Sequence, residues 1–310
     1  MRRRPSSINC IFAVDKPAGI TSHDLVSHVR RALGERRVGH AGTLDPAATG
    51  VLVVGVGQAT RLLGLLTAER KGYDGVIAFG TQTDTDDGEG QLVAEAQVPE
   101  SLADEAVARQ ILEGFLGSQD QVPPAYSAIS VDGRRAYDLA RSGKEMKLSS
   151  RHIEVFESSL RGIDRDESGT LCWSCHFEVS KGTYIRSLAR DIGLAAGTVA
   201  HLSALRRISS GLIGLDDCLE LEELEKRGKE ALEGRVLDPS RLLGASRLDL
   251  SDQEAADAAC GKRLRAPEGI GQGERVCLLH QGQMVGLWHR EGRGLRCDIN
   301  FPQAITGVRG

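Results

Sequence analysis

Residues 39–50, GHAGTLDPAATG, contain three glycines and no hydrophobic period, and they surround a single acid, Asp45. The apolar run VLVVGV follows at once and predicts a β-strand over 51–56. Two interpretations of Asp45 remain open. In one, Asp45 caps a single helical turn, with Pro46 as its first residue and Gly50 as its terminator. In the other, the glycines let the loop fold tightly and bring backbone or ligand atoms close to the carboxylate.

Hydrophobic patterns and capping residues predict both helices and strands along the first 245 residues. Ser22 is expected to cap a helix that Gly34 ends, and Ser101, with Asp104 in a near capping box, is expected to open another. Strands are expected at 8–14, 76–79, 152–160 and 171–179. Because these elements follow no strict βαβ rhythm, the pattern favours an α+β fold over a doubly wound sheet.

The last part of the chain has a different pattern, with one helix at 251–260 followed by short strands and glycine-rich turns. The segment ERVCLLHQGQMVGLWHREG predicts a β-hairpin that turns at Gln281-Gly282-Gln283. We therefore expect two domains, residues 1–245 and a small β-rich module at 246–310.

The composition excludes some classes of protein. The chain has 40 % hydrophobic and 26 % charged residues, which is ordinary for a globular protein, and no window approaches the roughly 18 apolar residues of a membrane span. A cytoplasmic protein is expected, since the apolar stretch near the N-terminus is too short for a signal peptide. The seven cysteines are expected to be reduced. Cys172 and Cys175 lie in an alternating strand pattern and not in a zinc motif.

The segment KGTYIRSLARDIG, residues 181–193, predicts a helix capped by Thr183 and ended by Gly193. Its core stripe is Ile185, Leu188, Ala189 and Ile192. Arg186 and Arg190 share the neighbouring face. Both could be solvated, but Arg186 falls in the first turn, where the helix dipole repels a cation. Its position therefore suggests an anionic partner, either a carboxylate or a phosphate.

Other local patterns are less specific. Tyr73, just before an expected strand and after Arg70 and Lys71, is either amphipathic packing or a stacking platform for a base. The acidic loop GTQTDTDDGEG lacks the spacing of a calcium loop, so a solvated turn is favoured over a metal site. Gly55-Val-Gly57 begins a dinucleotide-binding fingerprint, but Thr60 stands where its last glycine belongs. A nucleotide-dependent oxidoreductase is therefore disfavoured.

Taken together, five motifs resemble the TruB family of tRNA pseudouridine synthases. They are FAVDKPAGITSHD (12–24), GHAGTLDPAATGVL (39–52), KGY ahead of GTQTDTDDGEG, VPPAYSAIS with the following GRRAY, and KGTYIRSLARDIG. The C-terminal segment more loosely resembles a PUA-like RNA-binding module. The resemblance implies a pseudouridine synthase fold with a central, mostly antiparallel mixed sheet. It also implies base flipping of uridine 55 in the tRNA T-arm loop, cleavage of its C1′–N1 bond and formation of a C1′–C5 bond, without metal or organic cofactor.

The resemblance also implies roles for individual residues. Asp45 matches the essential aspartate, which either attacks the nucleotide or takes a proton from the sugar. Arg186 matches the arginine that pairs with that aspartate, and Tyr73 the aromatic residue that stacks on the extruded uracil. Two positions match residues that contact RNA: His40, which fills the space opened in the RNA, and Asp87, which contacts a neighbouring flipped nucleotide. Leu205 matches part of the pocket wall, and Lys16 matches a structural support.

A tRNA-modifying enzyme, monomeric and acting without an obligatory protein partner, is therefore the leading hypothesis. The net charge of -4 and pI of about 6.1 are more acidic than is usual for an RNA binder, so binding would depend on shape and local basic surface, including the N-terminal MRRRPSS. The alternative is a catalytically silent tRNA-binding or folding protein, in which Asp45 serves only as a helix cap.

Overall fold

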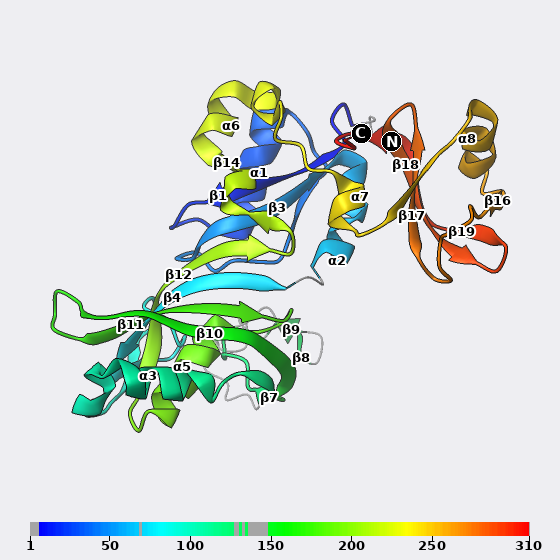
Figure 1. Ribbon diagram of the computed structural model, residues 1–310. Coiled ribbons are helices and arrows are strands. Elements are labelled where there is room, and N and C mark those ends of the chain that lie inside the picture. Colours follow the sequence, from blue (N-terminus) through cyan, green and yellow to red (C-terminus); the bar gives the residue numbers. More distant parts are fainter. Residues whose placement is uncertain (1–5, 68–69, 127–129, 132–133, 136–147, 310) are drawn as a thin grey trace. The chain divides into compact units, whose positions relative to one another are not determined.

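The computed structural model describes residues 6–67, 70–126, 130–131, 134–135 and 148–309, which fall into two compact units (Figure 1). Unit 1 consists of residues 1–68 and 210–310, and unit 2 of residues 69–209. Most of the basic arm at the N-terminus and parts of the motifs at 122–137 lie outside the described residues. Within the described part of the chain, no helix is long and apolar enough to cross a membrane.

The sheet of unit 1 is built around β1 (Cys10–Lys16). This strand pairs antiparallel with β3 (Thr49–Val56) and parallel with β14 (Cys218–Glu220), and β2 (Val38–Ala41) pairs antiparallel with β3. Both faces of β1 are buried. One face packs with α1 (Ser22–Leu33) and α6 (Leu221–Arg227), and the other joins a core shared with the C-terminal strands.

Helix α1 ends at Gly34, as predicted, with the glycine in the left-handed conformation at φ 64°. The prediction that Ser22 caps this helix is wrong. The cap is Thr21, whose hydroxyl accepts a hydrogen bond from the Asp24 amide while the Asp24 carboxylate accepts one from the Thr21 amide. The Ser22 hydroxyl is instead bonded to the backbone of Leu44.

Unit 1 also contains several short elements. They are η1 (Gly57–Arg61), α2 (Leu63–Leu66), β13 (Ile213–Gly214), η3 (Leu215–Asp217), η4 (Gly228–Leu232) and α7 (Pro239–Leu242).

The C-terminal strands form a five-stranded sheet in the order β15 (Ser246–Asp249), β17 (Arg275–His280), β18 (Gln283–Glu291), β19 (Gly294–Ile305) and β16 (Leu264–Arg265), with α8 (Asp252–Ala259). The predicted hairpin is confirmed, since Gln281 and Gly282, both with positive φ, connect β17 to β18. Residues such as Cys277, Met284 and Phe301 pack in one core with residues of β1 and β3. The boundary between residues 245 and 246 stays a prediction.

The sheet of unit 2 is antiparallel in the order β4 (Lys71–Phe79), β11 (Leu171–Val179), β10 (Arg151–Arg165) and β7 (Gly117–Gln121), with β12 (Ala200–Ser210) beside β4. Helices α3 (Glu105–Glu113) and α5 (Ile185–Ala195) lie next to each other against it (Figure 1). Asp104 caps α3 after the short η2 (Glu100–Ala103). Two hairpins, β5 (Thr81–Thr83) with β6 (Leu92–Glu95) and β8 (Ser130–Val131) with β9 (Arg134–Arg135), complete the unit.

The predicted fold class is confirmed, because the chain is α+β and its central strand pairs are antiparallel apart from the parallel pair of β1 with β14. All seven cysteines lie in the described residues and remain thiols. Cys172 and Cys175 lie within β11, as expected from the alternating pattern. Burial raises the pKa of the Cys175 thiol to about 12, which makes it inert at neutral pH.

Candidate active site

The Asp45 loop, residues 42–48, lies between β2 and β3 in unit 1. Gly42 and Gly50 have φ of 78° and 103°, so the glycines permit the tight path that the second interpretation of this loop required. The Ala48 amide donates to the Asp45 carbonyl at 3.1 Å and closes a turn, but β3 begins at Thr49 and no helix forms here. The interpretation of Asp45 as a helix cap is therefore wrong. Its side chain is half-buried.

Lys16 fixes this loop from inside the protein. Its side chain is fully buried, and the ammonium donates to the carbonyl oxygens of Pro17 at 2.9 Å, Ile20 at 2.7 Å and Pro46 at 3.0 Å. The Gly19 amide also donates to the Pro46 carbonyl, at 3.0 Å. The end of β1 and the start of α1 are therefore tied to the residue that directly follows Asp45, which agrees with a supporting role for Lys16.

Ser22 fixes the other side of the loop. Its hydroxyl donates to the Leu44 carbonyl at 3.0 Å and accepts from the Leu44 amide at 2.9 Å. The residues before and after Asp45 are thus both held, so the backbone position of the carboxylate is well defined. The sequence reasoning missed Ser22 because it assigned this serine to the helix cap. His40 lies on β2 opposite Val54 and is half-buried.

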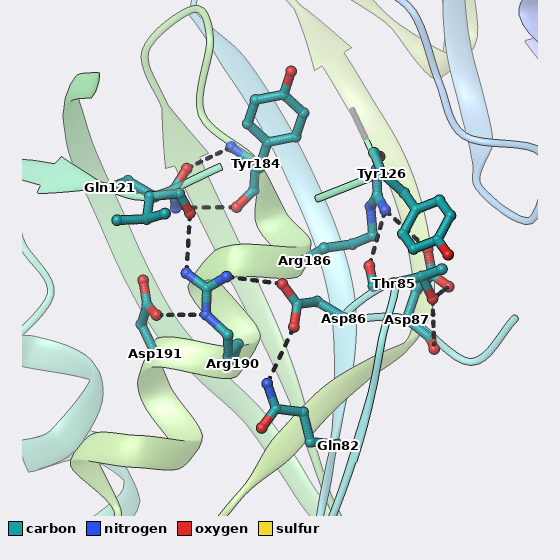
Figure 2. Close-up of polar contacts among 11 residues, drawn as sticks. Gln82, Thr85, Asp86, Asp87, Gln121, Tyr126, Tyr184, Arg186, Arg190 and Asp191 are labelled. Atoms are coloured by element: carbon teal, nitrogen blue, oxygen red, sulfur yellow. Dashed lines mark hydrogen bonds and ion pairs between the residues drawn. The ribbon is translucent and has the colours of Figure 1, made fainter. Parts of the chain in front are cut away.

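In unit 2, the first turn of α5 is held by a side-chain amide. Buried Gln121 donates to the Tyr184 carbonyl at 3.1 Å and accepts from the Tyr184 amide at 2.9 Å (Figure 2). Tyr184 precedes the helix, so the predicted cap at Thr183 is wrong: that hydroxyl donates to the Ser180 carbonyl instead. The predicted apolar stripe is confirmed, since Ile185, Leu188, Ala189 and Ile192 are all buried.

Arg186 is 5 % exposed, and its guanidinium is held by several oxygen atoms of unit 2. It donates to the Thr85 carbonyl at 2.9 Å and to the Tyr126 carbonyl at 3.1 Å, and it lies 3.3 Å from the Asp87 carboxylate. Figure 2 shows these groups around the guanidinium. The prediction that Arg186, in the first turn of the helix, has an anionic partner is confirmed, and Asp87 is one such partner.

Asp87 is itself oriented by its own loop. Its carboxylate accepts from the Thr85 hydroxyl at 2.6 Å and from the Glu89 amide at 3.1 Å. A contact between Asp87 and RNA stays a prediction. Asp84, in the same acidic loop, accepts from the Gln91 amide at 2.8 Å and so closes the hairpin of β5 and β6. No group of three or more candidate ligands among the described residues could hold a metal ion.

A second ion pair lies one helical turn further along α5. Arg190 donates to Asp86 at 2.9 Å, to Asp191 at 2.9 Å and to the Val122 carbonyl at 3.0 Å (Figure 2). Burial raises the pKa of Asp86, whereas Arg190 and Gln82 lower it. Burial is the larger effect, so the pKa lies above the ordinary value of an aspartate. The sequence offered a weak signal for this pair, because Arg190 shares a helical face with Arg186 and two adjacent acids occur at 86 and 87.

Tyr73 lies within β4, opposite Phe177 of β11, and not ahead of the strand as expected. It is 7 % exposed. Leu205 on β12 is half-buried, and its Cδ1 atom would lie 3.7 Å from a Cβ atom added at Gly75 of β4. Leu205 therefore packs against the same strand that carries Tyr73.

The predicted residues are thus divided between the units. Asp45, Lys16 and His40 belong to unit 1, and Lys16 is bonded to the loop that carries Asp45. Tyr73, Asp87, Arg186 and Leu205 belong to unit 2, where Arg186 and Asp87 are in contact. The pairing of Arg186 with Asp45 stays a prediction.

Family models match most of the chain. Residues 30–185 match the N-terminal domain of the TruB family pseudouridylate synthases, and residues 186–242 match the C-terminal domain of tRNA pseudouridylate synthase B.

Similar proteins are found among mycobacteria. The chain is 45 % identical over 277 residues to tRNA pseudouridine synthase B of Mycobacterium sp. (strain KMS), a match that covers 89 % of this chain and 91 % of the relative. It is 43 % identical over 286 residues to tRNA pseudouridine synthase B of Mycobacterium tuberculosis (strain CDC 1551 / Oshkosh), covering 92 % and 93 %.

Solved structures share the fold. A chain of a Cbf5–Nop10–Gar1 complex superposes with a TM-score of 0.68 at 25 % identity, covering 96 % of this chain and 85 % of that one. A chain of the archaeal box H/ACA sRNP Nop10–Cbf5 complex gives a TM-score of 0.66 at 22 % identity, covering 94 % and 85 %.

Proposed function

The chain belongs to the TruB family of pseudouridylate synthases, and from that premise we propose that it converts uridine 55 in the T-arm loop of tRNA to pseudouridine. The observation that carries the proposal is the similarity at 45 % identity over 89 % of the chain to a tRNA pseudouridine synthase B. The well-defined backbone on both sides of Asp45 and the buried guanidinium of Arg186 are compatible with it.

The reaction is an isomerisation that needs no net input of atoms. The C1′–N1 glycosidic bond breaks, the uracil turns, and a C1′–C5 bond forms. The proton on C5 is lost to solvent and N1 gains one, so substrate and product have the same composition. Because the glycosidic bond of a stacked nucleotide is inaccessible, the uridine must leave the loop before reaction.

Asp45 supplies the reacting carboxylate in this proposal. Either of its roles, attack on the nucleotide or removal of a sugar proton, needs a carboxylate held in a fixed place near the ribose. The bonds from Lys16 to the Pro46 carbonyl and from Ser22 to Leu44 provide that fixed place. Arg186 keeps the carboxylate ionised, and Tyr73 stacks on the extruded base.

The RNA contacts belong to the same proposal. His40 and Asp87 meet nucleotides beside the target, Leu205 forms part of the pocket wall, and the C-terminal sheet adds contacts to tRNA. The protein acts as a monomer in the cytoplasm, without cofactor or obligatory protein partner.

The test is tritium release from tRNA transcripts that carry 5-³H-uridine. Wild-type protein is expected to release tritium from position 55, and Asp45→Asn to slow this release by about 10³-fold because the amide can neither attack nor accept the proton. Binding of tRNA by Asp45→Asn, measured by filter retention, should remain near the wild-type value. Asp164→Asn, at an exposed position on β10, is the matched control and should react normally.

Two results would count against the proposal. Tight tRNA binding by the wild type with no tritium release would favour the silent RNA-binding protein. Normal turnover by Asp45→Asn would show that another group supplies the carboxylate.

A further inference from the structure

The acidic loop that holds Arg186 is itself held by a second arginine of the same helix. Asp86 and Asp87 are adjacent in the chain, and they pair with Arg190 and Arg186, which lie one turn apart on α5. Figure 2 shows the two ion pairs side by side. Arg186 and Arg190 are four residues apart and therefore lie on the same face of α5. For the adjacent Asp86 and Asp87 to reach this one face with both side chains, the loop backbone must turn between them.

The backbone at Asp86 makes that turn. Its φ is 60°, in the left-handed region that non-glycine residues seldom adopt. Its carbonyl accepts from the Leu202 amide at 3.1 Å, and the Gly88 amide donates to the Leu202 carbonyl at 3.1 Å. The loop is therefore fixed to β12 by its backbone and to α5 by its side chains. A strained conformation of this kind persists only where the surroundings enforce it.

The Asp86 carboxylate is 7 % exposed and the Arg190 side chain 16 %, so the pair is largely shielded from solvent. Burial of a carboxylate is costly, and the raised pKa of Asp86 reflects that cost. A specific geometric task accounts better for a buried pair at this place than stability does.

We propose that the Arg190–Asp86 ion pair positions Arg186 for the reaction, although neither Arg190 nor Asp86 touches the substrate. The inference rests on the proposed function. Two partners of Arg186, Thr85 and Asp87, flank Asp86 in the chain. Arg190 also donates to the Val122 carbonyl, a few residues before Tyr126, whose carbonyl accepts from Arg186. Arg190 thus holds both the loop and the segment at 122–126 that supply the acceptors of Arg186.

The role of a positioning pair differs from that of a binding residue. If the guanidinium of Arg186 is displaced by a fraction of an ångström, substrate still binds but the reacting geometry is lost. The effect is therefore expected in kcat and not in KM. A purely structural pair would lower the stability of unit 2 and leave kcat per folded molecule unchanged.

The experiment uses the full chain with Asp86→Asn, Arg190→Gln, the double variant and Arg190→Lys. Asparagine keeps the shape of the side chain and tolerates the left-handed backbone, so Asp86→Asn changes the charge with little added strain. In steady-state tritium release, both single variants should lower kcat by about 10- to 100-fold with KM nearly unchanged. The double variant should be no slower than the slower single variant, because both remove the same interaction. Arg190→Lys keeps the positive charge but not the planar set of donors of a guanidinium, so its kcat should lie between those of the wild type and Arg190→Gln.

Arg109→Gln is the matched control, since Arg109 forms an exposed ion pair with Glu105 on α3 in the same unit. It should leave kcat and KM unchanged. If the wild type turns over but both single variants keep kcat within about twofold, the pair has no positioning role. A rise in KM alone, or additive losses in the double variant, would also overturn the inference. Absence of turnover by the wild type would instead refute the proposed function.

Discussion

At the scale of single residues, the fully buried Lys16 shows how one charge can organise a loop through hydrogen bonds to backbone carbonyls. Its ammonium donates to three carbonyl oxygens from two segments, at 17–20 and at Pro46. Hydrogen bonds that involve an ionised donor are stronger than neutral ones, so three carbonyl dipoles go far towards offsetting the lost hydration. One buried cation therefore holds the Pro46 side of the Asp45 loop, and Ser22 holds the Leu44 side.

Lys16→Met is expected to remove these bonds while keeping most of the apolar volume of the side chain. The carbonyls of Pro17 and Ile20 lose a donor, whereas that of Pro46 keeps the Gly19 amide. We expect a loss of about 3 kcal/mol in the free energy of unfolding of unit 1. The measurement is urea unfolding followed by the fluorescence of Trp288, which is buried in unit 1, in a Trp173→Phe background. Lys229→Met, at an exposed lysine, should change little.

Elementary electrostatics predicted the anionic partner of Arg186 but not its identity. The argument from the helix dipole required only that the cation lie in the first turn of the helix, which the sequence shows. One partner, Asp87, belongs to a loop far away in the sequence, and its contact with α5 is set by the packing of the sheet. The positive φ of Asp86 is equally a result of tertiary structure, so the paired arrangement of 86 and 87 could not be predicted.

At the scale of elements, the prediction for α5 was correct in its apolar face and wrong at both ends. The helix runs past Gly193 to Ala195. A glycine near the end of a helical pattern usually marks a C-terminal cap, but Gly193 has another task. A Cβ atom at this position would lie 2.6 Å from the Ala200 Cβ and amide nitrogen. Gly193 is therefore needed so that the last turn of α5 can approach the start of β12.

Gly193→Ala tests this explanation because helix propensity and packing predict opposite signs. Propensity alone would stabilise the helix by about 1 kcal/mol. The contact with Ala200 includes backbone atoms, which cannot move aside as a flexible side chain could, so we expect a net loss of about 2 kcal/mol in the stability of unit 2. Urea unfolding followed by Trp173, buried in unit 2, measures it.

The control for Gly193→Ala is Gly64→Ala in α2, where an added Cβ would meet nothing within 4 Å. Measured with Trp288, it should be neutral or slightly stabilising. A stabilised Gly193→Ala protein would show that the approach of α5 to Ala200 does not require a glycine at this position.

At the scale of the whole chain, the strand order depends on contacts between distant segments that local patterns do not encode. The sequence predicted β1 and β3, but not that residues 218–220 would pair with β1 on its other edge. It also predicted a β-rich C-terminal segment, but not that residues of β17, β18 and β19 would share a core with β1 and β3. Ala13 and Cys218 are paired although they lie more than 200 positions apart, and Ile11 shares a core with Ile305. No periodicity in the sequence reports on such contacts.

The Asp238 carboxylate bonds to several segments of unit 1, including the residues near the C-terminus. One of its oxygens accepts from the Ser240 amide at 2.9 Å and the Ser240 hydroxyl at 2.7 Å, and the other from Arg247 at 2.6 Å and the Arg309 amide at 3.1 Å. The backbone of the neighbouring Leu237 is bonded to Ile11 of β1. Asp238 therefore connects the segment before the C-terminal sheet with the last residues of the chain.

This arrangement predicts a pH dependence with a definite sign. Burial acts to raise the pKa of Asp238, but the hydrogen bonds from Ser240, Arg309 and Arg241 together hold it below its ordinary value of 3.8. Because the folded state prefers the ionised carboxylate, its contribution to stability is complete above the pKa of the unfolded chain. That contribution is lost as the pH falls through the lower pKa of the folded state.

Asp238→Asn removes this ionisation, and near neutral pH it should destabilise unit 1 by about 2 kcal/mol, because the amide presents donors to Arg247 and the Arg309 amide. Urea unfolding followed by Trp288, at several pH values from neutral to about pH 3, should show the difference between wild type and variant shrinking only below the ordinary pKa of an aspartate. Asp249→Asn, at an exposed acid of β15, should give a small difference without that trend. If the difference in unfolding free energy between the wild type and Asp238→Asn stays constant down to the lowest pH, the carboxylate is not preferentially ionised in the folded protein. The C-terminal residues would then be held by the other bonds of Arg247 and Arg309.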